Sequence, residues 1–127
     1  MRREVDALRA HLRRGGLIAY PTESCYGLGC DPRNTHALGK LIALKGRSAA
    51  QGLLLIADRF KRLAPFVRPL APADRDRLAR TWPGPVTWVV PASHACPALL
   101  TGGRPTVAVR VTAHAGAARL CRALDTA

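Results

Sequence analysis

Two cations separated by a single residue, Lys45 and Arg47, stand out first as a pair whose spacing could do chemistry. Lys45 lies seven residues after Leu38 and four after Leu41, so it falls on the apolar stripe of an expected helix, at its C-terminal end. A lysine there either reaches out to water or points into an internal cleft. Two cations this close repel each other unless an anion joins them, although the helix dipole also mildly favours cations at this end. The pair therefore indicates either an anion site or two solvated charges.

The segment from Pro21 to Gly29 is the second candidate, and we expect it to be a glycine-bearing loop that follows a short apolar run. Thr22, Ser24 and Tyr26 offer hydroxyl groups, and the glycines let the backbone approach a ligand closely. The alternative is a strand-to-loop turn whose polar side chains satisfy local backbone groups. The segment matches neither a G-x-x-x-x-G-K-[ST] nor a G-x-G-x-x-G pattern. Beside the Lys-x-Arg pair, it strengthens the prediction of an anion pocket at the end of a strand.

Arg110 is the third candidate, within the alternating run Thr106–Thr112. It shares a face with Ala108 and Thr112, and these small neighbours leave room for a ligand. An arginine in an apolar strand is costly unless it is paired, and a carboxylate or phosphate ligand would match its planar fork. If the run is instead an edge strand, Arg110 simply faces water.

Neither the cysteines nor the histidines form a recognisable chemical pattern. The cysteines at 25, 30, 96 and 121 include no C-x-x-C pair, so we expect free thiols rather than a zinc site. Cys25 is better explained as a small buried hydrophobe than as a nucleophile, because no histidine lies nearby in the sequence. His36, His94 and His114 have no metal-ligand spacing, so no metal site in the protein itself is predicted.

The elements that must position these residues can be read from periodicity and from breaker residues. Gly46 is placed to stop the second helix, and Pro65 must end or distort the third. Pro- and Gly-rich His94–Pro105 is expected to be a surface loop. Strands that alternate with helices predict an α/β fold. We expect helices at Arg3–Arg14, from Asn34 or Thr35 to Leu44, and at Arg59–Val67, Pro72–Thr81 and Ala115–Leu124, with strands at Leu17–Tyr20, Leu53–Ile56, Pro85–Val90 and Thr106–Thr112.

The net charge and the lack of long apolar runs limit the kinds of partner that the chain is expected to have. The 127 residues include 20 Lys and Arg against 8 Asp and Glu, a net charge of +12, which attracts polyanions such as nucleic acid or nucleotide phosphates. Arginine outnumbers lysine 17 to 3, and a GC-rich coding sequence would produce the same bias, so charge alone identifies no function. We see no secretory signal and no apolar run of the ~18 residues needed to cross a bilayer. A cytoplasmic protein with no membrane partner is therefore expected.

Four segments follow one another along the chain: Tyr20–Pro32 (YPTESCYGLGCDP), Leu44–Arg47 (LKGR), Trp82–Thr87 (WPGPVT) and Val107–Thr112 (VAVRVT). Together they resemble the successive motifs of one family, the YrdC-like or TsaC threonylcarbamoyl-AMP synthases, and they occur in the family's order. The resemblance extends from about Gly15 to Ala123. It implies a YrdC-like (RibB-like) α/β fold with a twisted open mixed sheet, flanking helices and a basic concave cleft, in a single domain over residues 1–127.

The resemblance also implies an enzyme, an L-threonylcarbamoyladenylate synthase. Such an enzyme converts L-threonine, bicarbonate and ATP to threonylcarbamoyladenylate and pyrophosphate, with Mg²⁺ accompanying ATP. The product serves the N6-threonylcarbamoyl modification of adenosine 37 in tRNA. The implied partners are tRNA or double-stranded RNA, bound in the basic cleft, and the proteins of the tRNA threonylcarbamoyl-transferase complex.

Site residues follow from the same resemblance, position by position. Lys45 and Arg47 match the family's Lys-x-Arg pair, for which catalytic and ATP-phosphate-binding roles are implied. Arg110 is implied to contact ATP as well as L-threonine. The positions matched to the L-threonine site are Thr22, Tyr26, Arg110 and Thr112.

The sequence departs from the family pattern at its C-terminal end. The family's domain continues past the helix at Ala115–Leu124 into a strand and a Ser-x-Asn motif of the form S-T-S-A-N, which is not found here. The resemblance therefore implies a C-terminally shortened chain that lacks a core strand and two of the family's ligands.

Two other functions stay open. A non-catalytic RNA-binding module, using a basic cleft, would bind RNA with strong salt dependence and without threonine, although the charges are not interleaved with aromatic residues in the sequence. A carbamoyl-transfer module of the kind embedded in hydrogenase maturation proteins would use carbamoyl phosphate. It should come with zinc-finger and acylphosphatase-like segments, and this sequence contains neither.

Overall fold

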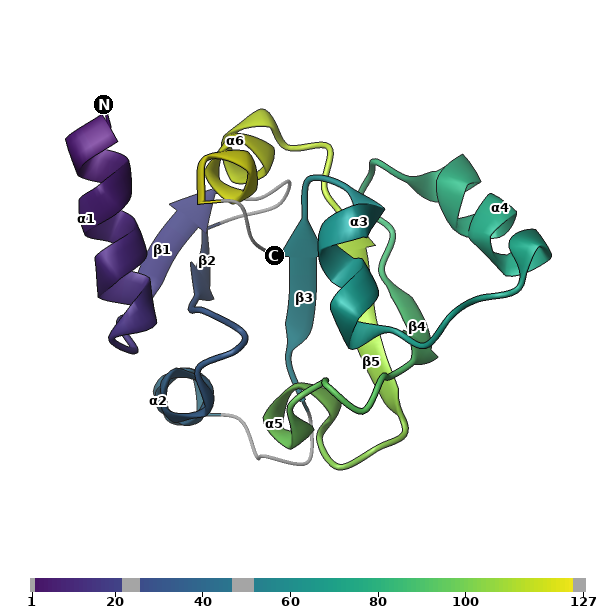
Figure 1. Ribbon diagram of the computed structural model, residues 1–127, viewed down its shortest axis with the longest axis horizontal. Helices are drawn as coiled ribbons and strands as arrows, with labels where there is room; N and C mark the ends of the chain where they lie inside the picture. The colour runs from purple at the N-terminus through teal and green to yellow at the C-terminus, as the bar shows by residue number, and fades with distance from the viewer. Residues whose placement is uncertain (1, 22–25, 47–51, 125–127) are drawn as a thin grey trace.

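The structure is a computed structural model that describes residues 2–21, 26–46 and 52–124 (Figure 1). Helices and strands alternate along the chain, as expected for an α/β protein. Within the described residues, no helix is both long and apolar enough to cross a membrane. In chain order the elements are α1 (Arg2–Arg13), β1 (Ile18–Pro21), β2 (Tyr26–Gly29), α2 (Thr35–Lys45), β3 (Leu54–Ala57), α3 (Phe60–Leu63), the 3₁₀ helix η2 (Ala64–Phe66), α4 (Pro72–Thr81), β4 (Trp88–Pro91), α5 (Ala98–Thr101), β5 (Thr106–Val111) and α6 (Ala115–Leu124).

β5 is the central strand of a three-stranded mixed sheet in the order β3-β5-β4. It runs parallel to β3, with Leu55 opposite Val109, and antiparallel to β4, with Trp88 also opposite Val109. The mixed α/β arrangement confirms the expected fold class. The alternative in which Arg110 lies on an edge strand is wrong, because β5 has a neighbour on each side.

The two faces of this sheet differ in exposure, as the alternation in β5 predicts. The three valines of β5 are at most 5% exposed and belong to the main core cluster. The opposite face is open, since Leu54 is 37% exposed and Val89 is 66% exposed. Ala108 and Arg110 lie on this open face and are half-buried. The sheet therefore presents Arg110 on the side that the core leaves accessible.

The glycine-bearing loop expected between Pro21 and Gly29 is shorter than predicted, because part of it is a strand. β2 pairs antiparallel with β1, with Ile18 opposite Gly29 and Pro21 opposite Tyr26. Glycine has low strand propensity, so the run Tyr-Gly-Leu-Gly did not indicate a strand by itself. Gly29 is needed here for space: a Cβ at this position would lie 2.7 Å from Cε1 of Tyr20.

Breaker and capping residues act where the sequence placed them. Asn34, rather than Thr35, caps α2, because its side chain accepts a hydrogen bond from the backbone N–H of Ala37 at 3.0 Å. Gly46 ends α2 in the left-handed conformation at φ 69°. Pro65 follows the end of α3 and lies in the 3₁₀ helix η2, which confirms the predicted distortion.

The stretch His94–Pro105 is not only a surface loop, so that prediction is wrong in part. It contains the one-turn helix α5, whose Leu100 is 3% exposed. The carbonyl of Leu100 accepts a hydrogen bond from the backbone N–H of Leu53 at 3.0 Å, which ties the start of β3 to α5. The prolines and glycines around α5 masked this short helix in the sequence.

Candidate functional site

A cavity of about 400 Å³ lies between the β1–β2 hairpin and strand β3 and is bordered by α1, α2 and α6. Most of its lining is apolar, and both the hairpin and the sheet contribute to it. The polar side chains among its described lining residues are few, and they come from several parts of the chain. They are Tyr20, Asp31, Lys45 and Arg110, with the thiols of Cys30 and Cys121.

Lys45 reaches this cavity because α2 ends there. It is the last residue of the helix, and the backbone N–H of Gly46 caps the helix by donating to the carbonyls of Ala43 and Ile42. Leu38 and Leu41, on the same helical stripe, are buried and also line the cavity. Lys45 lies on that stripe yet remains exposed, so its ammonium is available both to water and to an anion in the cavity.

Arg110 enters the same cavity from the central strand, and a threonine holds its guanidinium. The hydroxyl oxygen of Thr87 accepts hydrogen bonds from Nε of Arg110 at 3.0 Å and from Nη2 at 2.7 Å. The register explains the contact, because Trp88 pairs with Val109 and the residues before and after them are therefore cross-strand neighbours. Thr87 was not named from the sequence as a site residue, although it lies in the expected strand Pro85–Val90 and ends the Trp82–Thr87 motif.

Asp31 and Tyr20 also line the cavity and were not proposed as site residues. The carboxylate of Asp31 accepts a hydrogen bond from the backbone N–H of Arg33 at 2.9 Å, which holds the turn before α2. In the described part of the chain, Asp31 is the only acid among the lining residues. Both residues belong to the Tyr20–Pro32 motif, and each lies near the end of a strand, Tyr20 in β1 and Asp31 after β2. Membership of this motif was the sequence signal that could have identified them.

Thr112 lies just past β5 and is 3% exposed. Its hydroxyl accepts a hydrogen bond from the backbone N–H of His114 at 3.0 Å, at the start of α6. Its own backbone N–H donates to the carbonyl of Ala57 at 3.0 Å. Thr112 is not among the cavity's described lining residues, so its assignment to the threonine site stays a prediction.

Several predicted site residues fall outside the described part of the chain. Thr22 and Arg47 are among them, as are Ser24 and Cys25. For Tyr26 the backbone is described, paired with Pro21, whereas its side chain is not. The roles implied for Thr22, Tyr26 and Arg47 therefore stay predictions.

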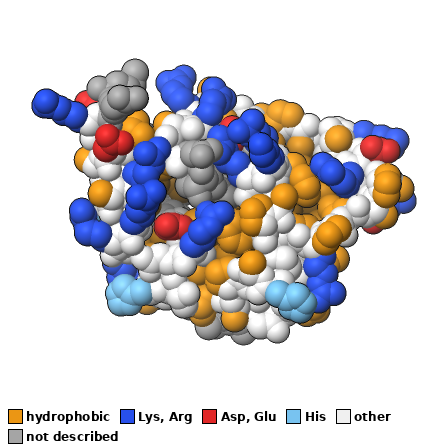
Figure 2. All heavy atoms as spheres, viewed as in Figure 1, with side chains coloured by type: hydrophobic (Ala, Val, Ile, Leu, Met, Phe, Trp, Pro, Cys, Tyr) orange, Lys and Arg blue, Asp and Glu red, His pale blue; other side chains and the backbone are white. Residues whose placement is uncertain are grey.

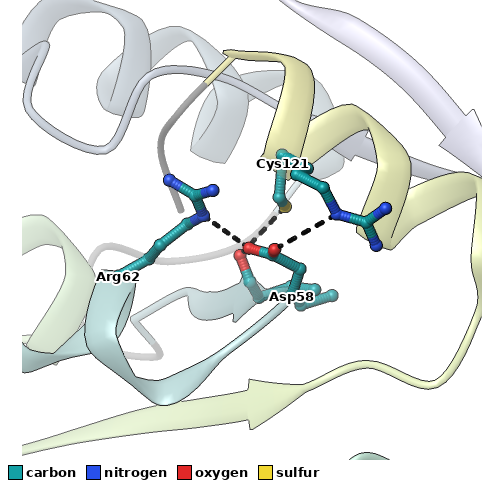
Figure 3. A network of polar contacts seen from close by, with 5 residues as sticks. Asp58, Arg62 and Cys121 are labelled. Carbon is teal, nitrogen blue, oxygen red and sulfur yellow. Dashed lines mark hydrogen bonds and ion pairs between the residues drawn. The ribbon is translucent and has the colours of Figure 1, made fainter.

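Helix α6 holds the hairpin and the sheet together across the cavity. It contacts α1, β1 and β3, and Nη2 of Arg9 in α1 donates to the carbonyl of Ala123 at 3.0 Å. On the other side, the carboxylate of Asp58, just after β3, accepts a hydrogen bond from Nε of Arg62 and pairs with Arg122 of α6 at 3.7 Å (Figure 3). The shape of the cavity thus depends on α6.

The surroundings of the two cavity thiols disfavour their thiolate form. Burial raises the pKa of Cys30 from 9.0 to about 11, and the nearby Asp31 charge adds to the effect. Burial likewise raises the pKa of Cys121 to about 11, with a further contribution from Asp58. Cys30, Cys96 and Cys121 are all free, as predicted. Over residues 2–21, 26–46 and 52–124, no group of three or more His, Cys, Asp or Glu side chains could hold a metal ion.

The family model for Sua5, YciO and YrdC proteins, described as telomere recombination, matches residues 10–127. A threonylcarbamoyl-AMP synthase of Thiobacillus denitrificans is 72% identical over 120 residues, which are 94% of this chain and 64% of that protein. A threonylcarbamoyl-AMP synthase of Methylobacillus flagellatus is 54% identical over 116 residues, which are 91% of this chain and 64% of that protein. The chain thus spans somewhat under two thirds of the length of these relatives.

Solved structures give the same grouping. A Sua5 protein of P. abyssi, solved in complex with L-threonine, superposes with a TM-score of 0.88 at 32% identity, over 99% of this chain and 37% of that one. YciO of E. coli superposes with a TM-score of 0.84 at 24% identity, over 99% of this chain and 61% of that one. The second likeness supports the fold alone.

Proposed function

Because this chain belongs to the Sua5/YciO/YrdC family, we propose that it is an L-threonylcarbamoyladenylate synthase, which makes threonylcarbamoyladenylate and pyrophosphate from L-threonine, bicarbonate and ATP. The names of its relatives support the proposal. The observation that carries it is the convergence of Lys45 and Arg110, from α2 and β5, on one cavity.

The proposed reaction brings three anionic groups together. The amine of threonine adds to bicarbonate, water is lost, and a carbamate forms. A carbamate oxygen then attacks the α-phosphorus of ATP, and the bond from that phosphorus to the oxygen bridging to the β-phosphate breaks, so pyrophosphate leaves. The threonine carboxylate, the carbamate and the triphosphate repel one another, so fixed cations that offset their charge lower the barrier.

The two cavity cations suit different anions. Arg110, whose guanidinium is oriented by Thr87, presents a planar fork that matches a carboxylate or a phosphate. Lys45 is a flexible point charge on the exposed side of the cavity, which suits a triphosphate that enters from water. Arg47 follows it in the sequence and would add a second phosphate contact. Thr22, Tyr26 and Thr112 are proposed for the threonine site.

Mg²⁺ would accompany ATP and reduce the negative charge of its phosphates. Asp31 is the one carboxylate that the described chain offers to the cavity, which fits a cation held mainly by the nucleotide. The protein residues themselves would bind and orient the two substrates.

The experiment is an assay of pyrophosphate release by the purified chain, with and without L-threonine and bicarbonate. Release should require both substrates, and Lys45→Ala should lower the rate by about 100-fold, as expected for removal of a cation that stabilises developing charge. Lys40→Ala is the matched control, because Lys40 is an exposed lysine of the same helix that does not line the cavity. Pyrophosphate release that does not depend on threonine, or equal rates for Lys45→Ala and Lys40→Ala, would contradict the proposal.

The proposed partners are tRNA, or double-stranded RNA, and the proteins that transfer the threonylcarbamoyl group, in the cytoplasm. The net charge of +12 supports a polyanionic partner. Figure 2 shows Lys and Arg side chains gathered over the upper left of this face, where α1 and α6 lie. A non-catalytic RNA-binding module is the second candidate, and the pyrophosphate assay separates the two.

A further inference from the structure

A second cleft, of about 290 Å³, lies between α3 and α4, and none of its described lining residues lines the first cavity. In Figure 2, hydrophobic side chains lie between the positions of α3 and α4, with Lys and Arg side chains beside them. Its lining includes Asp58, Arg59, Phe60, Arg75 and Trp82.

Two aromatic rings meet in this cleft although they lie far apart in the sequence. The rings of Phe60 and Trp82 are stacked, with centroids 6.4 Å apart and planes inclined by 28°. Both side chains are half-buried, so part of each ring remains accessible. Nε1 of Trp82 donates to the carbonyl of Val86 at 2.7 Å, which fixes the indole in place. The rings form a rigid apolar surface before any ligand arrives.

Cations rim the same surface. The guanidinium of Arg75, on α4, lies 5.0 Å from the centroid of the Phe60 ring, and Arg59 borders the cleft from the start of α3. Both arginines are exposed. Among the lining residues that the structure describes, the one acid is Asp58, whose side chain is 7% exposed and already engaged by Arg62 and Arg122. The rim therefore presents net positive charge to an incoming ligand.

We propose that this cleft binds an unpaired nucleotide of an RNA strand. A base would stack against the accessible part of the Phe60 and Trp82 rings, with the exposed Arg75 guanidinium at its edge, and Arg59 would contact the adjacent phosphate. Nucleobases stack on aromatic side chains and on guanidinium planes, whereas bases paired within a duplex are not accessible for such contacts. The proposal concerns binding alone and does not depend on the synthase activity.

The test measures binding of fluorescein-labelled single-stranded RNA of about ten nucleotides to the full chain, over a range of salt concentrations. Phe60→Leu removes the ring but keeps an apolar side chain and changes no charge. Arg75→Gln removes the cation at an exposed position. Arg77→Gln is the matched control, because Arg77 is an exposed arginine of the same helix, paired with Asp74 at 4.0 Å and outside the cleft lining. Thermal melting of each variant checks folding.

We expect Phe60→Leu and Arg75→Gln each to weaken RNA binding about tenfold, because each removes a side chain that would contact the stacked base. Arg77→Gln should weaken binding less than about twofold, because Arg77 does not line the cleft. The salt dependence should be unchanged in Phe60→Leu, since no charge is lost. Bound RNA should quench Trp82 fluorescence, measured in Trp88→Phe protein. The proposal is overturned if Phe60→Leu binds like the unmodified chain, or if both arginine variants weaken binding equally. It is also overturned if duplex RNA of the same length binds as tightly and with the same sensitivity to Phe60→Leu.

Discussion

Arg110 enters the cavity from the central strand, and the Thr87 hydroxyl fixes the direction in which its guanidinium points. An unsupported arginine has many rotamers, and ordering one on ligand binding costs conformational entropy. Two hydrogen bonds to one oxygen reduce that cost before the ligand arrives. At the residue scale, the candidate site therefore depends on Thr87 as well as on the two cavity cations.

The first prediction concerns this contact. Thr87→Val removes the acceptor and keeps the shape, so we expect the proposed synthase to lose about tenfold in kcat/KM, as for the loss of a hydrogen bond to a charged group. Steady-state pyrophosphate release measures it, and Thr87→Ser, which retains the hydroxyl, should restore most of the activity. Thr87 is exposed, so stability should hardly change. Full activity in Thr87→Val would show that the reaction does not depend on the hydrogen bonds by which Thr87 orients Arg110.

A second prediction follows from Cys121. Burial raises its pKa to about 11 in the folded chain, against 9.0 for the ordinary thiol. Between these pH values the unfolded thiol is ionised while the folded one keeps its proton, so the free energy of unfolding falls as the pH rises. Urea denaturation at about pH 8 and about pH 10.5 should show a smaller fall in Cys121→Ala than in the unmodified chain. Identical pH dependence in the two proteins would argue against a buried neutral thiol.

At the scale of elements, α6 determines how the hairpin and the sheet lie relative to each other. Its contacts reach α1, β1 and β3, and its Arg122 pairs with Asp58. The thiol of Cys121 donates to the carbonyl of Ile56 at 3.7 Å, which adds a weak contact to β3. The helix formed where the sequence predicted it, and its role as a bridge follows from these contacts.

The third prediction tests the charge network of Figure 3. The side chains of Asp58 and Arg62 are 7% and 8% exposed, so Asp58→Asn weakens the pairing of a buried cation. We expect a loss of about 3 kcal/mol in the free energy of unfolding. Arg122→Gln should cost less than about 1 kcal/mol, because an exposed ion pair contributes little, and the Arg122 side chain is 67% exposed. Urea denaturation measures both, and equal losses would contradict the distinction.

At the scale of the molecule, two packed groups enclose the cavity: the three-stranded sheet with its helices, and the β1–β2 hairpin with α1. The buried valines of β5 lie between neighbouring strands, whereas the described residues of the hairpin are mostly half-buried. The cavity of about 400 Å³ takes the place of packing contacts between the groups. Stability should therefore be unevenly distributed.

The fourth prediction is that amide hydrogens of β1 and β2 exchange with solvent more readily than those of β5. We expect protection at least about tenfold lower in the hairpin, because local opening there disrupts fewer buried contacts than opening of the core strand. Native-state hydrogen exchange followed by NMR measures each amide. Equal protection would mean that the hairpin opens only when the whole molecule unfolds.

Much of the fold could be predicted from local pattern. The helices at Pro72–Thr81 and Ala115–Leu124 have the predicted bounds, because the proline that begins the first and the apolar spacing of the second are local properties of the chain. Strand β2 and helix α5 were missed, because a glycine-rich strand and a proline-flanked turn of helix carry no periodic signal. Lys45 and Arg110 were named from the sequence, whereas Thr87 became visible only through strand register.

The sequence by itself determined most of the helices and strands, the α/β class and the family resemblance, because each rests on residue types at short spacing. The tertiary structure decided which side chains meet. Arg110 contacts Thr87 across 23 positions, the Cys121 thiol reaches Ile56 across 65, and Phe60 stacks on Trp82 from another helix end. Such contacts depend on strand register and on how helices pack over the sheet, and many residues jointly determine both.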